Sequence, residues 1–474
     1  MKKNLFVVAA VVLMAMISCN KEIYNGGEPQ APQAPEVVEP SYYVEFTADL
    51  GAEETVTPTV QQSATRTTID VANKKTLWVA GDAISVNGKK FVVKELIDGG
   101  LSARFVNEGE LGSDFKAPYK AQYPYTSNGT LSISASQTAF AGDFDANAVA
   151  AFAYSTDNVL KFMNATSLLK FQVPAACQKV TLSSDNALAG TLTITWPTTD
   201  DGTPTATASG KEVTISGDFK TGNDYYVAVL PGTKANFVVR IDGYLSKNAA
   251  SVTVNRSTIA NMKTLPAPVA SGWTIVGAHN SWNASTGIKL YNDISGAVAK
   301  NVTGGSEFKL VKNGSEWFST MVPAGKKGSW CKLHMNRVNM KPASGSVDVW
   351  VNADGTACGV VDKNASMPST YQYYVVLQHN WSWSNRKLHS WIVNPESNLM
   401  GNWPGSSPKG TFNYDNNGYS YWEIPTKANE VKIGVIFSNN GSDQTQNHYI
   451  NPLNTDKCYW LEYRSGKGNF PVEM

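Results

Sequence analysis

The sequence of 474 residues carries 40 Lys and Arg against 39 Asp and Glu, a formal net charge of +1 at pH 7. Charged residues make up only 17% of the chain, so neither nucleic acid nor another strongly anionic partner is expected. Hydrophobic residues at 42% and 38 glycines predict folded, turn-rich domains rather than disorder. The length corresponds to about three or four domains.

The first residues predict an exported protein. A short basic segment precedes an apolar stretch over residues 5–17. This stretch is shorter than a membrane-spanning helix requires and has the layout of a signal peptide, residues 1–18. Residues 16–19, Met-Ile-Ser-Cys, resemble a bacterial lipobox. The resemblance implies a lipid-modified Cys19 and an outer-membrane lipid anchor, whereas the alternative is a plain signal peptide with an incidental cysteine.

A proline-rich segment follows over residues 19–41. Prolines recur at positions 29, 32, 35 and 40, a composition that favours a semi-rigid tether holding the folded domains away from a membrane. The dipeptide Lys21-Glu22 resembles the export tag of Bacteroidetes surface lipoproteins. That resemblance implies an outer-membrane lipoprotein that faces the cell exterior.

Residues 42–265 predict strands and turns. Short β-prone runs alternate with Gly, Asn and Asp, and no long segment has a helical period. Such runs are residues 43–47, 83–86, 91–93, 191–195 and 225–230. We expect two β-sandwich subdomains here, and an all-β chain of tandem, immunoglobulin-like β-sandwich domains overall.

The order of motifs in residues 42–265 resembles the fimbrillin-like family of Bacteroidetes. The matching segments are residues 65–67, 76–86, 121–125, 133–137 and 164–171. Subunits of that family polymerise by strand donation through their terminal strands, whereas this region continues into two further modules. The resemblance therefore implies a fimbrial tip or accessory adhesin rather than a repeating shaft subunit. The sequence leaves open whether Arg66 is a processing site.

After a Pro- and Ala-rich linker, residues 273–363 resemble the immunoglobulin-like repeats of outer-membrane starch-binding lipoproteins. The matching segments are residues 273–277, 281–283, 307–314, 347–352 and 359–361. Trp282, Trp317 and Trp330 fall in or beside polar loops and are candidates for a second sugar site. Ordinary packing at the sandwich ends is the alternative for each of them.

Residues 371–474 resemble family 26 starch-binding modules of amylases. The matching segments are residues 373–377, 388–392, 403–405, 421–425, 435–441 and 443–446. In that family, two aromatic residues on one strand and the Trp of a Trp-Pro-Gly turn form a platform under an α-glucan. By resemblance the platform is His389, Trp391 and Trp403, with an imidazole at the position of the family's usual aromatic phenol.

Strand geometry agrees with this assignment. Residues two apart in a strand share a face and lie about 7 Å from each other, so His389 and Trp391 are expected to project together. Gln444 and Gln446 stand where the family places amides that hydrogen-bond sugar hydroxyls, and an amide both donates and accepts. Two alternatives stay open: Trp403 locks a turn, or a register slip buries Trp391.

Tryptophan is concentrated in the C-terminal half, since eleven of thirteen lie from Trp273 onward. Trp is bulky and its N–H needs a hydrogen-bond acceptor when it is buried, so we expect some of these indoles to be exposed at the surface. The strand patterns predict that Trp273, Trp350 and Trp422 belong to the core. Two more, at positions 381 and 383, either border the platform or cover the end of the sandwich.

Catalysis and metal binding are not expected. Glycoside hydrolysis needs two facing carboxylates, and no matching motif is present; five scattered histidines do not form a metal site. No cofactor is expected. Cys177 and Cys458 are too isolated for a disulfide framework, and for Cys331 and Cys358 both a disulfide and separate buried thiols stay open.

These features together predict a non-catalytic cell-surface glycan-binding lipoprotein that captures starch or a related α-glucan, as polysaccharide or oligosaccharide, through aromatic platforms. An outer-membrane glycan transporter complex is a further expected partner, and nucleic acid is not. The alternative is the fimbrial tip or accessory adhesin. A third hypothesis is a non-catalytic subunit that binds a partner protein through its exposed aromatic side chains.

Overall fold

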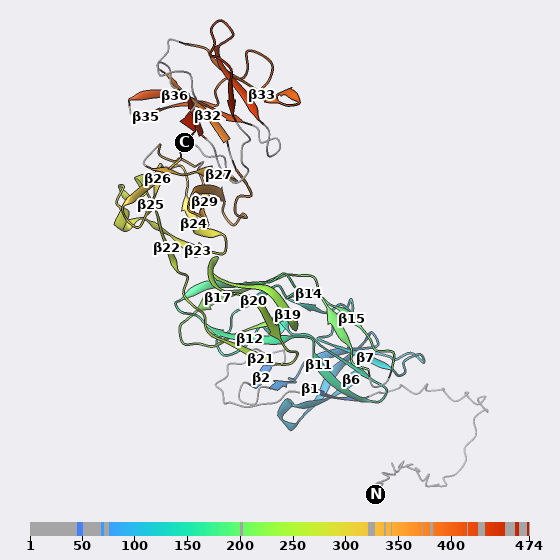
Figure 1. The fold of residues 1–474 in the computed structure, drawn as a ribbon. Coiled ribbons are helices and arrows are strands. Elements are labelled where there is room, and N and C mark those ends of the chain that lie inside the picture. The colour runs from blue at the N-terminus through green and yellow to red at the C-terminus, as the bar shows by residue number, and fades with distance from the viewer. Residues whose placement is uncertain are drawn as a thin grey trace, which may run out of the picture. The chain divides into compact units, whose positions relative to one another are not determined.

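The computed structural model describes residues 45–50, 68–70, 75–199, 202–320, 328–335, 338–342, 344–371, 373–379, 383–414, 416–424, 432–450, 460–463 and 472–473. These residues form strands joined by turns and four short 3-10 segments, which confirms the all-β class (Figure 1). The signal peptide, Cys19, the tether, Arg66, Trp381 and Cys458 lie outside the described residues. The domain boundaries expected from the sequence stay predictions. No helix among the described residues is long and apolar enough to cross a membrane.

The first body is a closed barrel with the strand order β1-β11-β10-β7-β4-β5-β6. Its strands are β1 (Glu45–Leu50), β4 (Ala83–Val86), β5 (Lys89–Ile97), β6 (Ser102–Asn107), β7 (Tyr119–Tyr123), β10 (Ala151–Ser155) and β11 (Val159–Asn164). The sequence predicted a sandwich subdomain instead. The difference arises at β1, which pairs antiparallel with β6 and parallel with β11 and so joins the two ends of the sheet.

The barrel is filled by aromatic side chains around Trp78, which is 1% exposed. Phe105, Tyr123 and Phe162 meet the Trp78 ring edge to face at centroid distances of 5.0, 5.1 and 5.4 Å. The indole Nε1 donates a hydrogen bond to the carbonyl oxygen of Ala48 at 3.2 Å. The apolar surface of this tryptophan is therefore buried, and its single donor is hydrogen-bonded, inside the protein.

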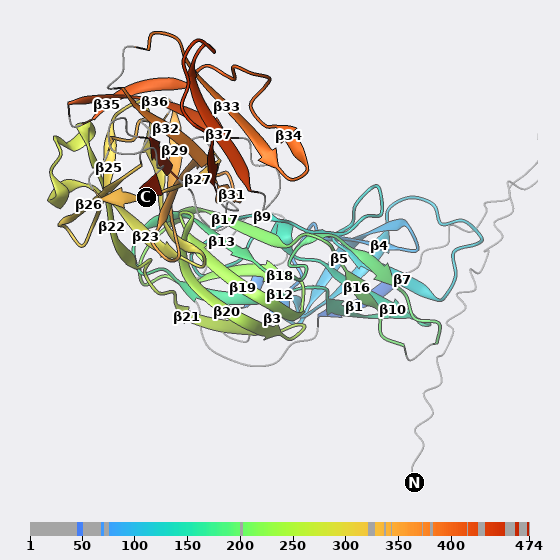
Figure 2. The same cartoon turned by 45° about the horizontal axis from the view of Figure 1, so that its top comes forward.

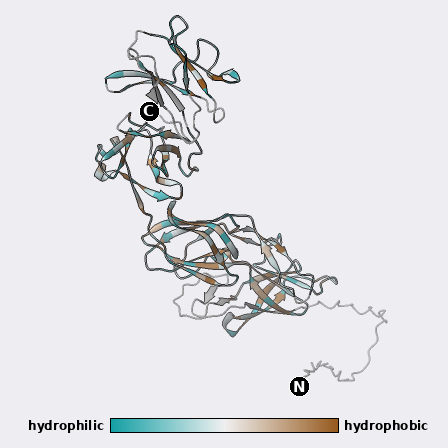
Figure 3. Ribbon diagram, viewed as in Figure 1, coloured by the Kyte–Doolittle hydropathy of each residue, from teal (hydrophilic) through white to brown (hydrophobic). Residues whose placement is uncertain are grey.

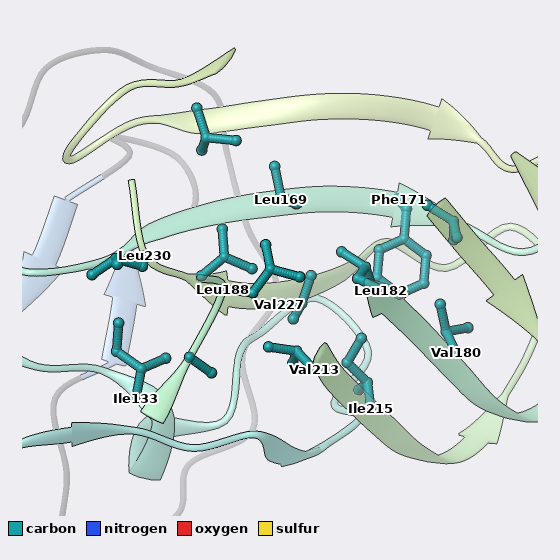
Figure 4. Close-up of a cluster of buried hydrophobic side chains, with 14 of the residues drawn as sticks. Ile133, Leu169, Phe171, Val180, Leu182, Leu188, Val213, Ile215, Val227 and Leu230 are labelled. Carbon is teal, nitrogen blue, oxygen red and sulfur yellow. The ribbon is translucent and has the colours of Figure 1, made fainter. Parts of the chain in front are cut away.

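The second body packs two sheets over a hydrophobic core (Figures 2 and 4). One sheet has the order β18-β12-β21 and the other β20-β19-β13-β17-β9. Their bounds are β9 (Ser136–Thr138), β12 (Ser167–Gln172), β13 (Cys177–Ser183), β17 (Glu212–Phe219), β18 (Tyr225–Val229), β19 (Gly232–Ile241), β20 (Tyr244–Val254) and β21 (Ile259–Thr264). Leu169 and Phe171 of β12 face Val180 and Leu182 of β13 across this core, as expected for strands that alternate between core and surface.

Short elements complete these two bodies. They are the strand pairs β2 (Thr68–Asp70) with β3 (Lys75–Leu77), β8 (Ser132–Ile133) with β14 (Gly190–Thr191), and β15 (Thr193–Thr195) with β16 (Thr205–Thr207), and the 3-10 segments η1 (Asp98–Gly100) and η2 (Ala146–Ala148).

The third body is one sheet with the order β28-β26-β25-β22-β23-β24-β29-β30-β27-β31. Its elements are β22 (Ala270–Gly277), η3 (Ala278–Asn280), η4 (Ala284–Thr286), β23 (Ile288–Asp293), β24 (Gly296–Thr303), β25 (Phe308–Lys312), β26 (Glu316–Ser319), β27 (Ser329–Lys332), β28 (His334–Met335), β29 (Ser346–Asn352), β30 (Ala357–Asp362) and β31 (Thr370–Tyr371). Trp273 and Trp350 are each 6% exposed, which confirms that both belong to the core.

The cysteines of the third body lie directly opposite each other on β27 and β30. The Cys331 and Cys358 thiols are both buried and form no disulfide with each other. Cys177 in the second body is also a buried thiol outside any disulfide. Burial disfavours a thiolate, and it raises the pKa of Cys177 to about 11 and that of Cys358 well above its usual value. These are structural thiols.

The fourth body consists of two sheets, ordered β35-β36-β32-β39-β40 and β34-β33-β37-β38. Their bounds are β32 (Tyr373–His379), β33 (Arg386–Val393), β34 (Glu396–Asn398), β35 (Gly410–Tyr414), β36 (Asn417–Ile424), β37 (Ile433–Asn439), β38 (His448–Ile450), β39 (Trp460–Tyr463) and β40 (Val472–Glu473). Hydrophilic and hydrophobic residues are mixed along the strands of this body (Figure 3).

The core of the fourth body contains Trp422, which is 1% exposed, and Trp383, which is 9% exposed. Trp422 Nε1 donates to the carbonyl oxygen of Ser406 at 2.8 Å, and Trp383 Nε1 donates to a carboxylate oxygen of Asp443 at 2.9 Å. The core position expected of Trp422 is confirmed. Trp383 packs in this core instead of lying at the surface, which favours the alternative that it covers the end of the sandwich.

Candidate functional site

The candidate site begins with the alternation of side chains on β33. Leu388 and Ser390 are fully buried, whereas His389 and Trp391 are half-buried on the other face. Their two rings stack at a centroid distance of 5.4 Å and an interplanar angle of 21°. The expected strand register is therefore correct, and the alternative that buries Trp391 in the core is wrong.

A glycine on the neighbouring strand determines how Trp391 lies. In the β33–β37 ladder, Trp391 pairs with Gly434. A Cβ atom added at Gly434 would lie 2.2 Å from both Cε2 and Cζ2 of the indole, which no side chain tolerates. Because position 434 has no side chain, the indole lies across the backbone of β37. This orientation leaves the opposite face of the ring turned away from the sheet.

Trp403 adds a third ring at one end of this pair. It is 44% exposed, and its ring meets that of His389 at 5.9 Å and 82°. The turn that carries it is held down on β33, because Leu388 and Ser406 exchange backbone hydrogen bonds at 2.9 and 3.0 Å. Gly405 has a φ of 97° and lies so near that a Cβ there would be 2.2 Å from the carbonyl oxygen of Leu388. The turn is thus fixed and the indole it carries is displayed.

Tyr449 is a fourth ring that the sequence did not single out. It lies on β38, pairs with Gly434 on the far side of β37, and is 51% exposed. Its ring meets that of Trp391 at 6.2 Å and 82°. The sequence signal was only an aromatic residue in a short run, His-Tyr-Ile, because its pairing with Gly434 becomes visible only when β38 is placed beside β37.

Together the four rings form a continuous series of neighbours, here called the aromatic row, which runs from Trp403 through His389 and Trp391 of β33 and then across the sheet to Tyr449. The two central rings are near parallel, and the two end rings stand close to perpendicular to their neighbours. Aromatic faces of this kind can pack against apolar CH surface. At the edges of the rings, the Tyr hydroxyl can donate or accept a hydrogen bond and the indole N–H can donate one.

The two predicted amides lie on the loop after β37. Gln444 and Gln446 are both exposed, and the residue between them fixes the loop: Thr445 N donates to Phe437 O at 2.9 Å and Thr445 Oγ1 accepts from Phe437 N at 3.1 Å. Gly441 of the same loop lies against the Trp403 indole, where an added Cβ would be 3.4 Å from Nε1. The loop therefore borders the Trp403 end of the aromatic row.

Charge plays a small part at this surface. Lys432 Nζ lies 5.1 Å from the centre of the Tyr449 ring, a cation–π contact that supports the exposed ring. Next to it, His448 is 7% exposed, and burial lowers the pKa of its imidazole below the usual value because the charged form is disfavoured. Lys432 thus places a positive charge at the Tyr449 end of the aromatic row, whereas His448 is buried.

The second predicted sugar site is brought together only in part. Trp282 and Trp317 are half-buried, with ring centroids 6.5 Å apart at 34°. Trp330 is 5% exposed and packs in the core with Val298 and Trp350. The expectation that Trp330 belongs to a surface site is wrong, because β27 is paired on both sides, with β30 and β31, and the ring is enclosed in this buried cluster.

Trp282 is held in an uncommon backbone conformation. Ser281 and Trp282 have φ angles of 54° and 62°, which costs energy for residues with a side chain. The Asn280 side chain supports the loop, since its Oδ1 accepts from Gly277 N at 3.0 Å and its Nδ2 donates to Asn283 O at 2.6 Å. The loop thus holds the Trp282 ring against the Trp317 ring.

No candidate metal centre is found in the described part of the chain. Within it, no three His, Cys, Asp or Glu side chains gather closely enough to hold a metal ion. The candidate site of this protein is the aromatic row.

Comparison with known proteins gave two partial matches. No protein-family model and no curated protein matches the chain. A solved structure of a candidate cell adhesion protein from Bacteroides ovatus is similar at 16% identity and a TM-score of 0.29, covering 47% of this chain and 92% of that one. A second, from Bacteroides uniformis, has 13% identity and a TM-score of 0.26 with the same coverage. At these scores the likeness carries no argument about the site.

Proposed function

We propose that this protein is a non-catalytic glycan-binding protein and that the aromatic row binds starch or a related α-glucan. The observation that supports this most is the pair of rings on β33. The His389 and Trp391 rings lie nearly parallel next to each other, and the indole face that does not cover Gly434 is turned away from the sheet. Sugar rings present flat CH faces, and stacking buries that surface without requiring charge. A neutral ligand also fits the net charge of +1.

The size of the expected effect follows from area. A Trp ring face covers about half of the 150–250 Å² that an aromatic side chain buries, which corresponds to about 2 kcal/mol at roughly 25 cal/mol per Å². Loss of one indole therefore weakens binding roughly 30-fold, since 1.4 kcal/mol is tenfold. The exposed amides of Gln444 and Gln446 add hydrogen bonds to hydroxyls at the Trp403 end.

A second, weaker site is proposed at Trp282 and Trp317. Two sites on one chain bind a long polysaccharide more tightly than either alone, because the second contact forms at a high effective concentration. In this proposal Cys19 carries the lipid, the tether places the binding modules at the outer surface of the outer membrane, and an outer-membrane glycan transporter complex receives the captured chain.

The proposal is tested by binding of the full chain to amylopectin, pullulan and a β-glucan in affinity electrophoresis. We expect retardation by the two α-glucans and its loss in Trp391→Ala and Trp403→Ala. A matched control is Phe140→Ala, which removes a ring of similar exposure, 46%, from the second body. Absence of α-glucan binding, or equal retardation in the wild type and both tryptophan variants, contradicts the proposal.

The fimbrial adhesin suggested by the sequence differs from this proposal in its target. An adhesin would use the same aromatic row on a host or partner glycan, so a screen of the full chain against a panel of host glycans separates the two. Binding to host glycans with no affinity for α-glucans favours the adhesin.

A further inference from the structure

The aromatic row has an end opposite Trp403, and this end is formed by Tyr449. We propose that Tyr449, supported by Lys432, is an additional sugar subsite that extends the platform across three strands and makes the site selective for longer chains. The inference rests on the proposed function, since it takes the row as a sugar-binding surface, and it adds a residue and a chain-length preference to it.

Tyr449 and Trp391 lie at paired positions across the sheet, with Gly434 between them. Trp391 on β33, Gly434 on β37 and Tyr449 on β38 are successive partners in the ladder, so they share one face of the sheet. The middle position carries no side chain. Trp391 fills the space above it, and the indole therefore reaches from its own strand to within 6.2 Å of the Tyr449 ring.

The second argument is exposure. Tyr449, at 51%, and Trp403, at 44%, are two of the large apolar residues that remain exposed in the described part of the chain, and they stand at the two ends of the same row. An isolated exposed ring needs no explanation, but contiguous exposed apolar surface marks a binding site. Lys432 contributes an ammonium 5.1 Å from the Tyr449 ring, which helps to hold the ring upright beside Trp391.

The third argument is spacing. Successive ring centres along the row are 5.9, 5.4 and 6.2 Å apart, steps comparable to the advance of one sugar unit along a glycan chain. A short oligosaccharide occupies Trp403, His389 and Trp391. Only a longer one also reaches Tyr449, where the phenol offers a ring and a hydroxyl that both donates and accepts.

The test compares two ligands on the full chain by calorimetric titration, maltotriose and maltohexaose. For Tyr449→Ala we expect an affinity for maltohexaose about tenfold weaker than wild type, as for loss of one stacked ring, and an affinity for maltotriose within about twofold of it. Tyr449→Phe keeps the ring and is expected to stay near wild type for both ligands. Phe140→Ala is the control for an exposed ring elsewhere, and thermal unfolding of each variant checks its fold.

The outcomes separate the inference from the proposed function. If the wild type and Tyr449→Ala bind maltohexaose equally while Trp391→Ala does not, the subsite is wrong and the proposed function stands. If Tyr449→Ala weakens both ligands equally, Tyr449 acts by positioning Trp391 and the chain-length preference is wrong. If the wild type binds no α-glucan, the proposed function fails and this inference fails with it.

Discussion

Trp78 in the barrel and Trp391 in the fourth body show two opposite uses of tryptophan within one chain. Trp78 is enclosed by three rings and its N–H is satisfied by Ala48. Trp391 has one stacked neighbour, His389, lies over a glycine, and turns its other face away from the sheet. The difference shows that the neighbours of an indole, above all a missing side chain across the ladder, decide whether the ring is enclosed in a core or lies at the surface.

The largest expected effect is on the stability of the barrel. Trp78→Ala removes a fully buried ring and leaves a cavity, which costs about 3–5 kcal/mol of unfolding free energy. Denaturant unfolding followed by circular dichroism measures it. Glycan binding by the folded protein is expected to stay unchanged, and a loss of affinity without a loss of stability would break the distinction between the two tryptophans.

The converse variant, Trp391→Ala, is expected to weaken α-glucan binding roughly 30-fold while it changes the unfolding free energy by about 1 kcal/mol or less, because the ring is only partly buried. Titration calorimetry and denaturant unfolding on the same preparation give both numbers. A stability loss as large as that of Trp78→Ala would show that Trp391 is a core residue after all.

Gly434→Ala changes the surroundings of Trp391 without replacing an aromatic residue. The added methyl group displaces the indole from β37, and we expect binding to weaken about tenfold, a change of roughly 1.4 kcal/mol. The check is a double-mutant cycle with Trp391→Ala. If the glycine acts through the indole, the double variant binds no worse than Trp391→Ala alone; additive losses would point to a different role for Gly434.

The smallest effect concerns pH. The buried His448 imidazole has a lowered pKa in the folded protein, so the unfolded chain takes up a proton first as pH falls below about 6.5. The free energy of unfolding is therefore expected to decrease from pH 7 toward the lowered pKa. His448→Gln should flatten this decline in thermal unfolding measured between pH 7.5 and pH 5.5. An equally steep decline in the variant would assign the effect to other groups.

Strand alternation made much of the fold and part of the site predictable. The all-β class, the core positions of Trp273, Trp350 and Trp422, and the shared face of His389 and Trp391 all depend on a period of two within a single strand. Such local patterns can be recognised in the sequence without knowing which strands are neighbours.

What the sequence could not show depends on pairing between distant strands. The closed barrel arises because β1 pairs with both β6 and β11, and the burial of Trp330 follows from its packing against Val298 and Trp350 of other strands. Tyr449 joins the row only through Gly434, fifteen positions earlier in the chain. No motif or local period records such long-range contacts.

The most direct test of the central claim is a crystal structure of the full chain with bound maltohexaose. We expect a sugar ring stacked on the exposed face of Trp391, with the glycan running from Trp403 toward Tyr449. Sugar bound elsewhere, with the aromatic row empty at a saturating ligand concentration, would contradict it.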